Sequence, residues 1–454
     1  MPPGGGMVER SSAQRRHWPA AIVPLLLFAE QMALGANGPI LALIASGAEI
    51  AAALCLLWLL QPPAAFWMKG WPVLLALLLA FLWLFMPALA PPFFAWAPVR
   101  PVPDLTLPGV VRWLGGASML LAGAWLSFRR GAMRHALDVM MGLGVVAILV
   151  GFAMRQYDPD HIWGQAKAIA MSRFTGTLLN ANAQATLAAI TALLGTGGLL
   201  VALRTGGLAD GASQSRAHLF FSAAACVGGL GACVGSGSRT ILVATVAAML
   251  LLAGADRRLR QQLWSRHGLV IGATVTIAIL LLSLGASDLT LSRFEMLESA
   301  SIVRGHFMTH YAGLVLKSPW IGYGTLSFDQ VNQANMGDPA GAMTFWYVHS
   351  PHNVILSLLM AGGFPYLLLL VAAIVMAGMQ VVRHRRADRS NPMLRAAVAG
   401  IGVIAVGSLV DIQADVPVLS STLCYLAAMI WGRALRVAVD GDAASPHPAV
   451  SQPA

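Results

Sequence analysis

The chain has 454 residues, of which 57% are hydrophobic and only 11% charged, and its formal net charge is +10. So few polar side chains could not cover a water-soluble globule of this length, and the composition therefore indicates an integral membrane protein. The positive charge does not favour nucleic acid as a partner, because the basic residues fall in short clusters between apolar runs, as in loops that set membrane topology. The four cysteines lie in apolar runs without metal-ligand spacing, which favours packing roles.

Hydrophobic runs follow one another along the chain after a polar start. Residues 1–17 are polar and basic, and no small-residue cleavage site follows at the right distance, so we expect an uncleaved cytoplasmic segment. Because a membrane-spanning helix needs ~20 apolar residues, the runs predict an all-α polytopic membrane protein with about 12 transmembrane helices. The expected spans are residues 20–34, 39–60, 72–90, 109–128, 136–154, 183–203, 219–235, 240–255, 268–286, 353–382, 393–411 and 418–435.

The distribution of Lys and Arg predicts which ends of these helices face the cytoplasm. With the amino terminus inside, every second loop is cytoplasmic, and those loops hold Lys69 and the clusters around Arg130, Arg204, Arg258 and Arg386. The opposite loops hold fewer cations, as the positive-inside rule requires. We therefore expect both termini in the cytoplasm, a transmembrane domain over residues 18–435, and a disordered cytoplasmic tail rich in Ala, Ser and Pro over residues 436–454.

The longest polar interval between spans covers residues 287–352, before the tenth expected span, and should lie on the outer, periplasmic side. It contains the turn Pro319-Trp-Ile-Gly-Tyr-Gly324. A concentration of cations and imidazoles in a chain with so little charge predicts a site for an anionic ligand. The groups concerned are Arg293, Arg304, Lys317, His349 and His352.

Two shorter outer segments carry further candidates. In the first, Arg173 is followed by Asn180 and Asn182 just before an apolar run, where amide side chains can cap a helix and an arginine can face an anion. A plain helix cap with a surface arginine is equally compatible with this pattern. In the second, Arg239 follows the tight turn over residues 235–238. An arginine at a membrane face can be an interfacial anchor, but its planar guanidinium can also bind two phosphate oxygens.

His352 and Asn353 open the tenth expected span. Such residues at a helix start are often caps, yet a neutral imidazole is also suited to accept a hydroxyl proton near neutral pH. No pair of carboxylates is placed as in a glycoside hydrolase, so hydrolysis is not inferred. His352 is therefore the candidate catalytic residue.

Taken together and in this order, the motifs resemble the O-antigen ligase and O-antigen polymerase superfamily of polytopic membrane glycan transferases. The resemblance covers roughly residues 160–380 and rests on four motifs: Arg173-x-x-Gly-Thr with Asn180-x-Asn182, Ser-x-Ser-Arg239-Thr, Arg304 with Pro319-x-x-Gly322-x-Gly324, and His352-Asn353 at a helix start.

The resemblance implies a metal-independent enzyme without a cofactor. Its reaction would move a glycan from undecaprenyl pyrophosphate to an acceptor hydroxyl on a glycolipid such as lipid A core, a growing glycan or a protein. It implies a place in lipopolysaccharide or other surface-polysaccharide biosynthesis, in the bacterial inner membrane with the active site facing the periplasm. By position, Arg239 and Arg304 would bind the pyrophosphate and His352 would be catalytic, with Arg173, Asn182 and Asn353 as further substrate-binding residues.

One departure keeps the subclass open. In the ligase pattern a histidine, a polar residue and a nine-residue spacer lead to Gly-x-x-Gly, whereas here they lead to Gly363-Phe-Pro-Tyr366. Ligase, polymerase and protein O-oligosaccharyltransferase therefore remain alternatives. A proton-coupled transporter is the alternative from another class, because Glu30, Glu49 and Asp138 lie within expected spans, but the sequence lacks the paired broken helices or related halves typical of such proteins.

Overall fold

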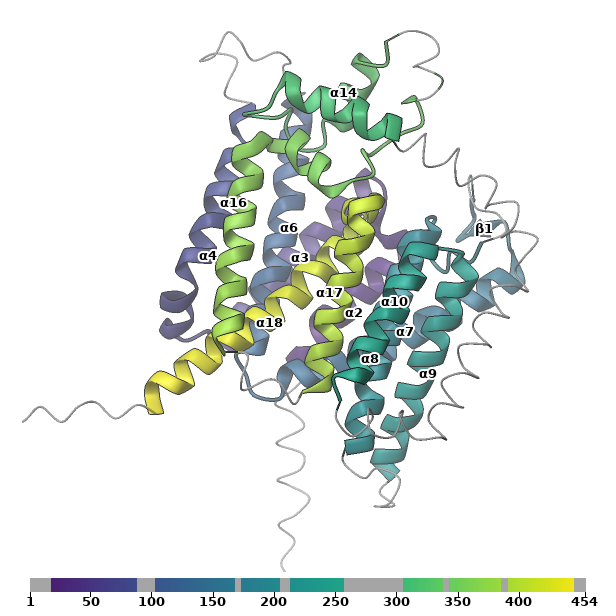
Figure 1. The fold of residues 1–454 in the computed structure, drawn as a ribbon, viewed down its shortest axis with the longest axis vertical. Coiled ribbons are helices and arrows are strands. Elements are labelled where there is room, and N and C mark those ends of the chain that lie inside the picture. The colour runs from purple at the N-terminus through teal and green to yellow at the C-terminus, as the bar shows by residue number, and fades with distance from the viewer. Residues whose placement is uncertain are drawn as a thin grey trace, which may run out of the picture.

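The computed structural model describes residues 18–87, 103–167, 173–204, 213–256, 305–337, 343, 345–384 and 391–444. Within these ranges the chain is a bundle of helices (Figure 1), and the strands are a single short antiparallel pair, β1 (His161–Ile162) with β2 (Gln165–Ala166). Nine described helices are long and apolar enough to cross a membrane. They are α3 (Pro39–Leu60), α4 (Ala64–Trp83), α6 (Pro103–Ser127), α7 (Ala132–Tyr157), α8 (Ala181–Arg204), α9 (Ser213–Ser236), α16 (Val354–His384), α17 (Pro392–Val410) and α18 (Pro417–Ala444).

The all-α polytopic fold predicted from the hydrophobic runs is confirmed. Besides the nine long helices, two shorter apolar ones fall on expected spans: η1 (Trp18–Ala21) continued by α2 (Ile22–Met32), and α10 (Arg239–Gly254). The remaining expected span, residues 268–286, lies outside the described residues, as do residues 1–17 and 287–304.

Two expected boundaries are wrong. The helix α4 begins at Ala64, so Lys69 lies inside the helix rather than in the preceding loop. The helix α18 continues to Ala444, so the tail expected to be disordered from residue 436 is helical as far as that residue. Its end is tied to the turn between α6 and α7, because Arg436 donates to the carbonyl of Ser127 at 3.1 Å and Arg130 pairs with Asp440 at 3.1 Å. Residues 445–454 lie outside the described part of the chain.

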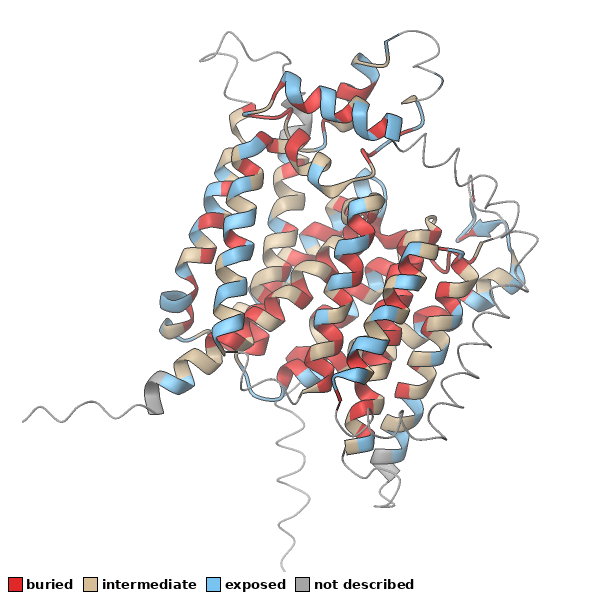
Figure 2. Cartoon of the chain, viewed as in Figure 1, coloured by how far each residue is buried: buried red, intermediate tan, exposed pale blue. Residues whose placement is uncertain are grey.

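The helices divide into central and peripheral ones. In their most apolar windows, 78% of α8 and 72% of α18 is buried, against 28% of α4 and of α7, and buried positions concentrate accordingly in the middle of the bundle (Figure 2). Glycines let α8 and α9 approach closely: a Cβ on Gly195 would lie 2.5 Å from the amide nitrogen of Cys226, and one on Gly229 would lie 2.6 Å from the carbonyl oxygen of Ala188. Close backbone approach through small residues is the usual way in which helices associate within lipid.

The connections gather at two ends of the bundle. One end carries β1 and β2, the turn before α10, the short helix η4 (Ile412–Asp415) and, beyond the helix ends, the helix α14 (Phe328–Ala334) (Figure 1). We call the residues described between 305 and 352 the outer segment. The opposite end carries the turn over residues 128–131 and the end of α18.

The outer segment has its own apolar core. A helix over residues 305–317 packs with α14, and the buried side chains include Phe307, Tyr311, Tyr323 and Val348. At its centre lies Asn332, which is 1% exposed. A buried amide must be satisfied internally, and the hydroxyl of Tyr311 donates to Asn332 Oδ1 at 3.2 Å. The segment is therefore a packed unit rather than an irregular loop.

The helix α16 is interrupted where the sequence departs from the ligase pattern. Gly363 has φ 69° and ψ −169°, a conformation that favours glycine, and Pro365 follows inside the helix. A proline and a non-helical residue release carbonyls from the helical hydrogen-bond ladder, and in a membrane these must find other donors. The indole nitrogen of Trp83 on α4 donates to one of them, the carbonyl of Gly362, at 2.9 Å.

The turn over residues 319–324 supplies the other partners of this break. A Cβ on Gly322 would lie 2.7 Å from the carbonyl oxygen of Met360, so only glycine allows the approach. The turn thereby fixes the outer segment onto α16. Three backbone hydrogen bonds join them: Tyr323 N–H to Met360 O at 2.7 Å, Gly324 N–H to Ala361 O at 3.0 Å, and Phe364 N–H to Pro319 O at 2.8 Å.

Candidate active site

His352 lies two residues before α16, in a conformation that marks a constrained position. Its φ is 54°, which is uncommon for a residue other than glycine and is found often at functional sites. Its Nδ1 lies 3.2 Å from Oδ1 of Asp411, and its ring stacks on Phe307 at a centroid distance of 6.2 Å. A carboxylate beside Nδ1 favours the tautomer with hydrogen on that nitrogen, which makes Nε2 the proton acceptor.

Asp411 connects α17 to η4 and is the partner that sequence reasoning did not identify. Its side chain is 11% exposed, compared with 36% for His352. Burial by itself would raise the pKa of Asp411, but hydrogen bonds from His352, from the N–H of Ile412 and from Asn182 hold the pKa below its ordinary value. Asp411 is therefore a carboxylate at neutral pH, able to orient His352 and to stabilise the imidazolium that forms when His352 accepts a proton.

Two predicted binding residues join this pair from α8 and the segment before it. The amide nitrogen of Asn182 donates to Asp411 Oδ2, and Asn182 Oδ1 accepts from Arg173 Nη2 at 2.7 Å. Arg173 Nε donates to the carbonyl of Ser236. The capping role belongs to Asn180, whose Oδ1 accepts from the N–H groups of Asn182 and Ala183. The structure thus brings Arg173, Asn182 and His352 together through Asp411.

Arg239 begins α10 at the same end of the bundle. The turn before it bends at Gly237, where φ is 64°, and the carbonyl of Gly235 accepts from Phe174 N–H at 2.8 Å, which joins the turn to the segment of Arg173. Two residues further on, Ile241 packs against α17 near its end before Asp411. Its side chain lies 2.9 Å from the position that a Cβ added to Gly407 would occupy. Arg239 is half-buried there. Arg304 lies outside the described residues, which resume at residue 305.

Asn353 has the contacts of a helix cap. Its Oδ1 accepts from the N–H groups of Ile355 at 2.9 Å and Leu356 at 3.1 Å, and its Nδ2 donates to the carbonyl of Leu409 at 2.8 Å. These contacts fix the start of α16 against the end of α17, while a role in binding substrate stays a prediction. His349 points elsewhere: it is exposed and pairs with Asp329 at 3.1 Å.

A second carboxylate, also missed from the sequence, supports the backbone ahead of His352. Asp415 Oδ2 accepts from the hydroxyl of Ser350 and, at 3.4 Å, from that of Ser357. Burial raises the pKa of Asp415 above its ordinary value, against the opposing effects of Ser350 and the nearby Arg112. Arg112 on α6 donates to the backbone carbonyl of Asp415 at 3.4 Å. Asp415 therefore connects the segment before His352 to η4 and, through Arg112, to α6.

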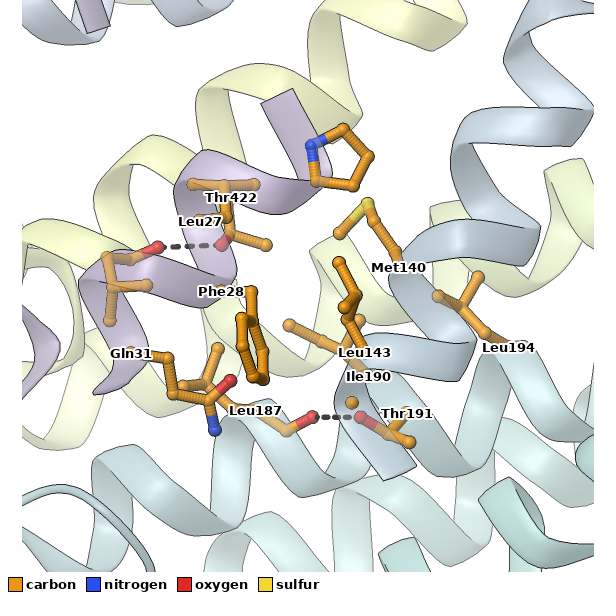
Figure 3. Close-up of a pocket in the computed structure, with 13 residues that line it drawn as sticks. Leu27, Phe28, Gln31, Met140, Leu143, Leu187, Ile190, Thr191, Leu194 and Thr422 are labelled. Carbon is orange, nitrogen blue, oxygen red and sulfur yellow. Dashed lines mark hydrogen bonds between the residues drawn. The ribbon is translucent and has the colours of Figure 1, made fainter. Parts of the chain in front are cut away.

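A pocket inside the bundle is separate from this network. It lies between α2, α7, α8 and α18 and is lined mainly by apolar side chains such as Leu27, Phe28 and Met140 (Figure 3). The hydroxyls of Thr191 and Thr422 in its wall donate to carbonyls of their own helices, those of Leu187 and Val418. Since its lining contains no titratable side chain, the pocket offers no group for acid-base chemistry.

Fold and site together define a multi-pass helical membrane protein with a histidine–aspartate pair at one end of its bundle. A family model described as O-antigen ligase matches residues 224–371, from within α9 through the outer segment to α16 beyond its break. The match supports membership of the chain in the O-antigen ligase superfamily, as its motifs predict, and a ligase- or polymerase-type membrane glycan transferase. None of the curated proteins matches the chain.

Proposed function

We propose that the protein moves a glycan from undecaprenyl pyrophosphate to an acceptor hydroxyl, in the manner of an O-antigen ligase. The observation that carries the proposal is the pair of His352, which lies in the matched family region, and Asp411, which follows α17. A partly exposed imidazole oriented by a buried carboxylate is suited to take a proton from a hydroxyl.

In the proposed reaction the acceptor oxygen attacks the anomeric carbon of the donor sugar. The bond from that carbon to the pyrophosphate oxygen breaks, and the electron pair leaves with undecaprenyl pyrophosphate. Nε2 of His352 accepts the hydroxyl proton, and Asp411 stabilises the resulting imidazolium. Because the leaving group is already a stable anion, the remaining requirement is positioning and charge stabilisation.

Arginines supply that charge stabilisation in the proposal. Arg239 and Arg304 are assigned to the pyrophosphate, since a guanidinium can bind two phosphate oxygens at once. Arg239 also begins a helix, and the positive end of a helix dipole favours an anion nearby. For Arg173, the bonds of Nε to Ser236 and of Nη2 to Asn182 support a role in holding Asn182 against Asp411.

We place the protein in a bacterial inner membrane with this site facing the periplasm. Arginines support that orientation, since Arg129 and Arg130 lie in the turn at the end of the bundle opposite His352, and Arg204 and Arg383 lie in the last turns of α8 and α16. Positive charge is typical of the cytoplasmic side. The acceptor decides between a ligase, a polymerase and a protein O-oligosaccharyltransferase, which share the chemistry.

Reconstitution tests the proposal. The full chain in lipid nanodiscs is incubated with a synthetic undecaprenyl pyrophosphate oligosaccharide and candidate acceptors, with a chelator present. We expect the oligosaccharide on the acceptor and an equal amount of free undecaprenyl pyrophosphate. Abolition by the chelator would replace the proposed chemistry with a metal-dependent one, and absence of transfer to every acceptor class would reject the function.

A further inference from the structure

Large aromatic side chains are displayed on the outer segment shortly before His352. Trp346 is 71% exposed and Tyr347 is 55% exposed, and the neighbouring Met343 is exposed as well. Trp346 and Tyr347 lie beside α14, because the carbonyls of Phe345 and Val348 on either side of them accept from Asn332 of that helix. Exposed apolar groups that stand together in this way typically mark a binding surface.

The backbone beneath these side chains is held firmly. Nδ2 of the buried Asn332 donates to the carbonyl of Phe345 at 2.9 Å and to that of Val348 at 3.1 Å, so its two hydrogen bonds bracket Trp346 and Tyr347. A surface whose backbone is fixed before binding loses less conformational entropy when a ligand arrives. The two rings are therefore presented on a backbone that is already fixed, and binding does not require residues 345–348 to become ordered.

Ring contacts connect the backbone that carries this surface to the candidate active site. The ring of Phe345, the residue before Trp346, lies 5.5 Å from that of Phe307, and the ring of Phe307 in turn stacks on His352 at 6.2 Å. Two ring contacts thus connect Phe345, the residue before the displayed aromatic side chains, to the imidazole. The displayed side chains therefore belong to the same packed unit as the groups that contact the imidazole.

The outer segment also carries exposed polar groups. His349 and Asp329 form an exposed pair at 3.1 Å, and Lys317 donates to Asn335 at 2.9 Å in the same segment. A loop that inserts into lipid would bring these charges with it at a cost in free energy. The combination of flat apolar faces with neighbouring hydrogen-bonding groups instead matches a pyranose ring, which has C–H groups on its faces and hydroxyls at its edge.

We propose that Trp346 and Tyr347 form a sugar-binding subsite that stacks against a pyranose ring of the glycan whose reacting end lies at His352. This inference rests on the proposed function, since it names a further contact of the same site. The ring can belong to the donor glycan or to the acceptor, and the chemistry of recognition is the same for both. Asp329 and His349 would accept from and donate to its hydroxyls.

Binding and transfer are measured separately to test the subsite. The full chain in nanodiscs of phosphatidylethanolamine and phosphatidylglycerol is applied to an array of bacterial surface oligosaccharides, and its affinity for the bound structures is determined in solution. We expect Trp346→Ala and Tyr347→Ala each to weaken binding at least about tenfold, as for aromatic side chains at the centre of an interface. The matched control is Trp320→Ala, because Trp320 is 59% exposed elsewhere on the outer segment.

Transfer kinetics then assign the sugar. A raised KM for the donor with an unchanged KM for the acceptor places the donor glycan on the subsite, and the reverse places the acceptor there. Equal binding and equal KM values in Trp346→Ala, Tyr347→Ala and wild type would overturn the subsite. Quenching of Trp346 fluorescence by brominated lipid in wild type, compared with Trp346→Phe, would also overturn it in favour of a membrane contact. Sugar binding without any transfer would keep the subsite and reject the proposed function.

Discussion

Two clusters of charged residues lie at opposite ends of the same helices. In one the carboxylate pairs with arginine, and in the other it pairs with histidine. At the end opposite His352, Asp256 after α10 accepts from Arg204 of α8 at 2.6 Å and 2.7 Å, with Arg395 of α17 3.9 Å away. At the outer end, Asn182 of α8 and His352 both contact Asp411, which follows α17. A carboxylate paired with arginine is locked in one charge state, since guanidinium is not deprotonated in proteins. An imidazole, unlike a guanidinium, can gain and lose a proton, so the outer cluster is suited to proton transfer. The inner cluster, whose charges are fixed, is suited to holding helices together.

The largest effect that separates the two clusters should come from His352→Ala. Removing the proton acceptor should lower the transfer rate by roughly 10²- to 10⁴-fold while the protein stays folded, because general base catalysis contributes about that much. Transfer from carrier-linked oligosaccharide by purified protein measures the effect. His161→Ala is the matched control, because His161 also pairs with an exposed carboxylate, that of Asp158 at 3.1 Å, and its rate should stay near that of wild type. Full activity in His352→Ala would remove it from the mechanism.

Asp411→Asn should have the next largest effect. The amide keeps the shape but no longer stabilises the imidazolium, and partners that orient a functional imidazole typically contribute about 10- to 100-fold. Rates are measured across pH, since a residue that acts through His352 changes the pH dependence of transfer as well as its size. An unchanged pH profile together with a merely lower yield of folded protein would assign Asp411 a structural role only.

Arg239→Lys should cost about tenfold in transfer although the charge is kept, because a planar fork is replaced by a point charge at the pyrophosphate. The loss should appear mainly in the KM for the carrier-linked donor. Arg130→Lys, in the exposed pair with Asp440, provides the control and should change little. If both lysine variants are tolerated equally, Arg239 is an interfacial anchor.

Asp256→Asn should affect stability rather than chemistry. Removing the carboxylate leaves Arg204 and Arg395 partly buried without their common anion, and breaking a buried ion pair typically costs about 3 kcal/mol. Thermal denaturation in detergent should show a lower transition temperature, while the rate per folded molecule should remain near that of wild type. A lower transfer rate in Asp256→Asn without a lower transition temperature would contradict the assignment of chemistry to the outer end and of stability to the inner end.

The pH dependence of stability should give the smallest effect, with opposite signs at two neighbouring acids. The pKa of Asp411 is lowered in the folded protein, so its contribution to stability is present above the unfolded pKa of about 3.9 and is lost as the pH falls through the folded pKa. The pKa of Asp415 is raised, so its contribution is present below about pH 3.9 and is lost as the pH rises through the folded pKa. At neutral pH, Asp411→Asn should therefore lower the transition temperature more than Asp415→Asn does, and the reverse order would contradict these environments.

The sequence predicted those parts of the molecule that local patterns determine. Runs of apolar residues located the described spanning helices because bilayer thickness dictates their length. The motifs also pointed to His352, Arg173 and Asn182, which the structure brings together through Asp411, while their roles stay predictions. The carboxylates were missed because their partners are distant in sequence: Asp411 is 59 residues from His352 and 229 from Asn182. An acid in the short connection between two spans was the available signal.

Tertiary contacts explain the remaining differences. The missing glycine of the ligase pattern falls at Tyr366, while the break of α16 at Gly363 is bridged by hydrogen bonds between α16 and the turn over residues 319–324. Likewise, the helical end of α18 depends on the pair of Arg130 and Asp440. Neither contact could be read from local composition. Glu30 and Glu49, which suggested a transporter, are buried, and Glu49 accepts from Ser421 of α18.

A double-mutant cycle on the transfer rate tests the central claim that His352 and Asp411 act as one unit. The rates of wild type, His352→Ala, Asp411→Asn and the double variant are measured on purified protein with the same carrier-linked donor. If Asp411 acts through His352, the double variant should be no slower than His352→Ala, because the aspartate has no imidazole left to orient. Losses that multiply in the double variant would show that the two residues act independently and would contradict the account.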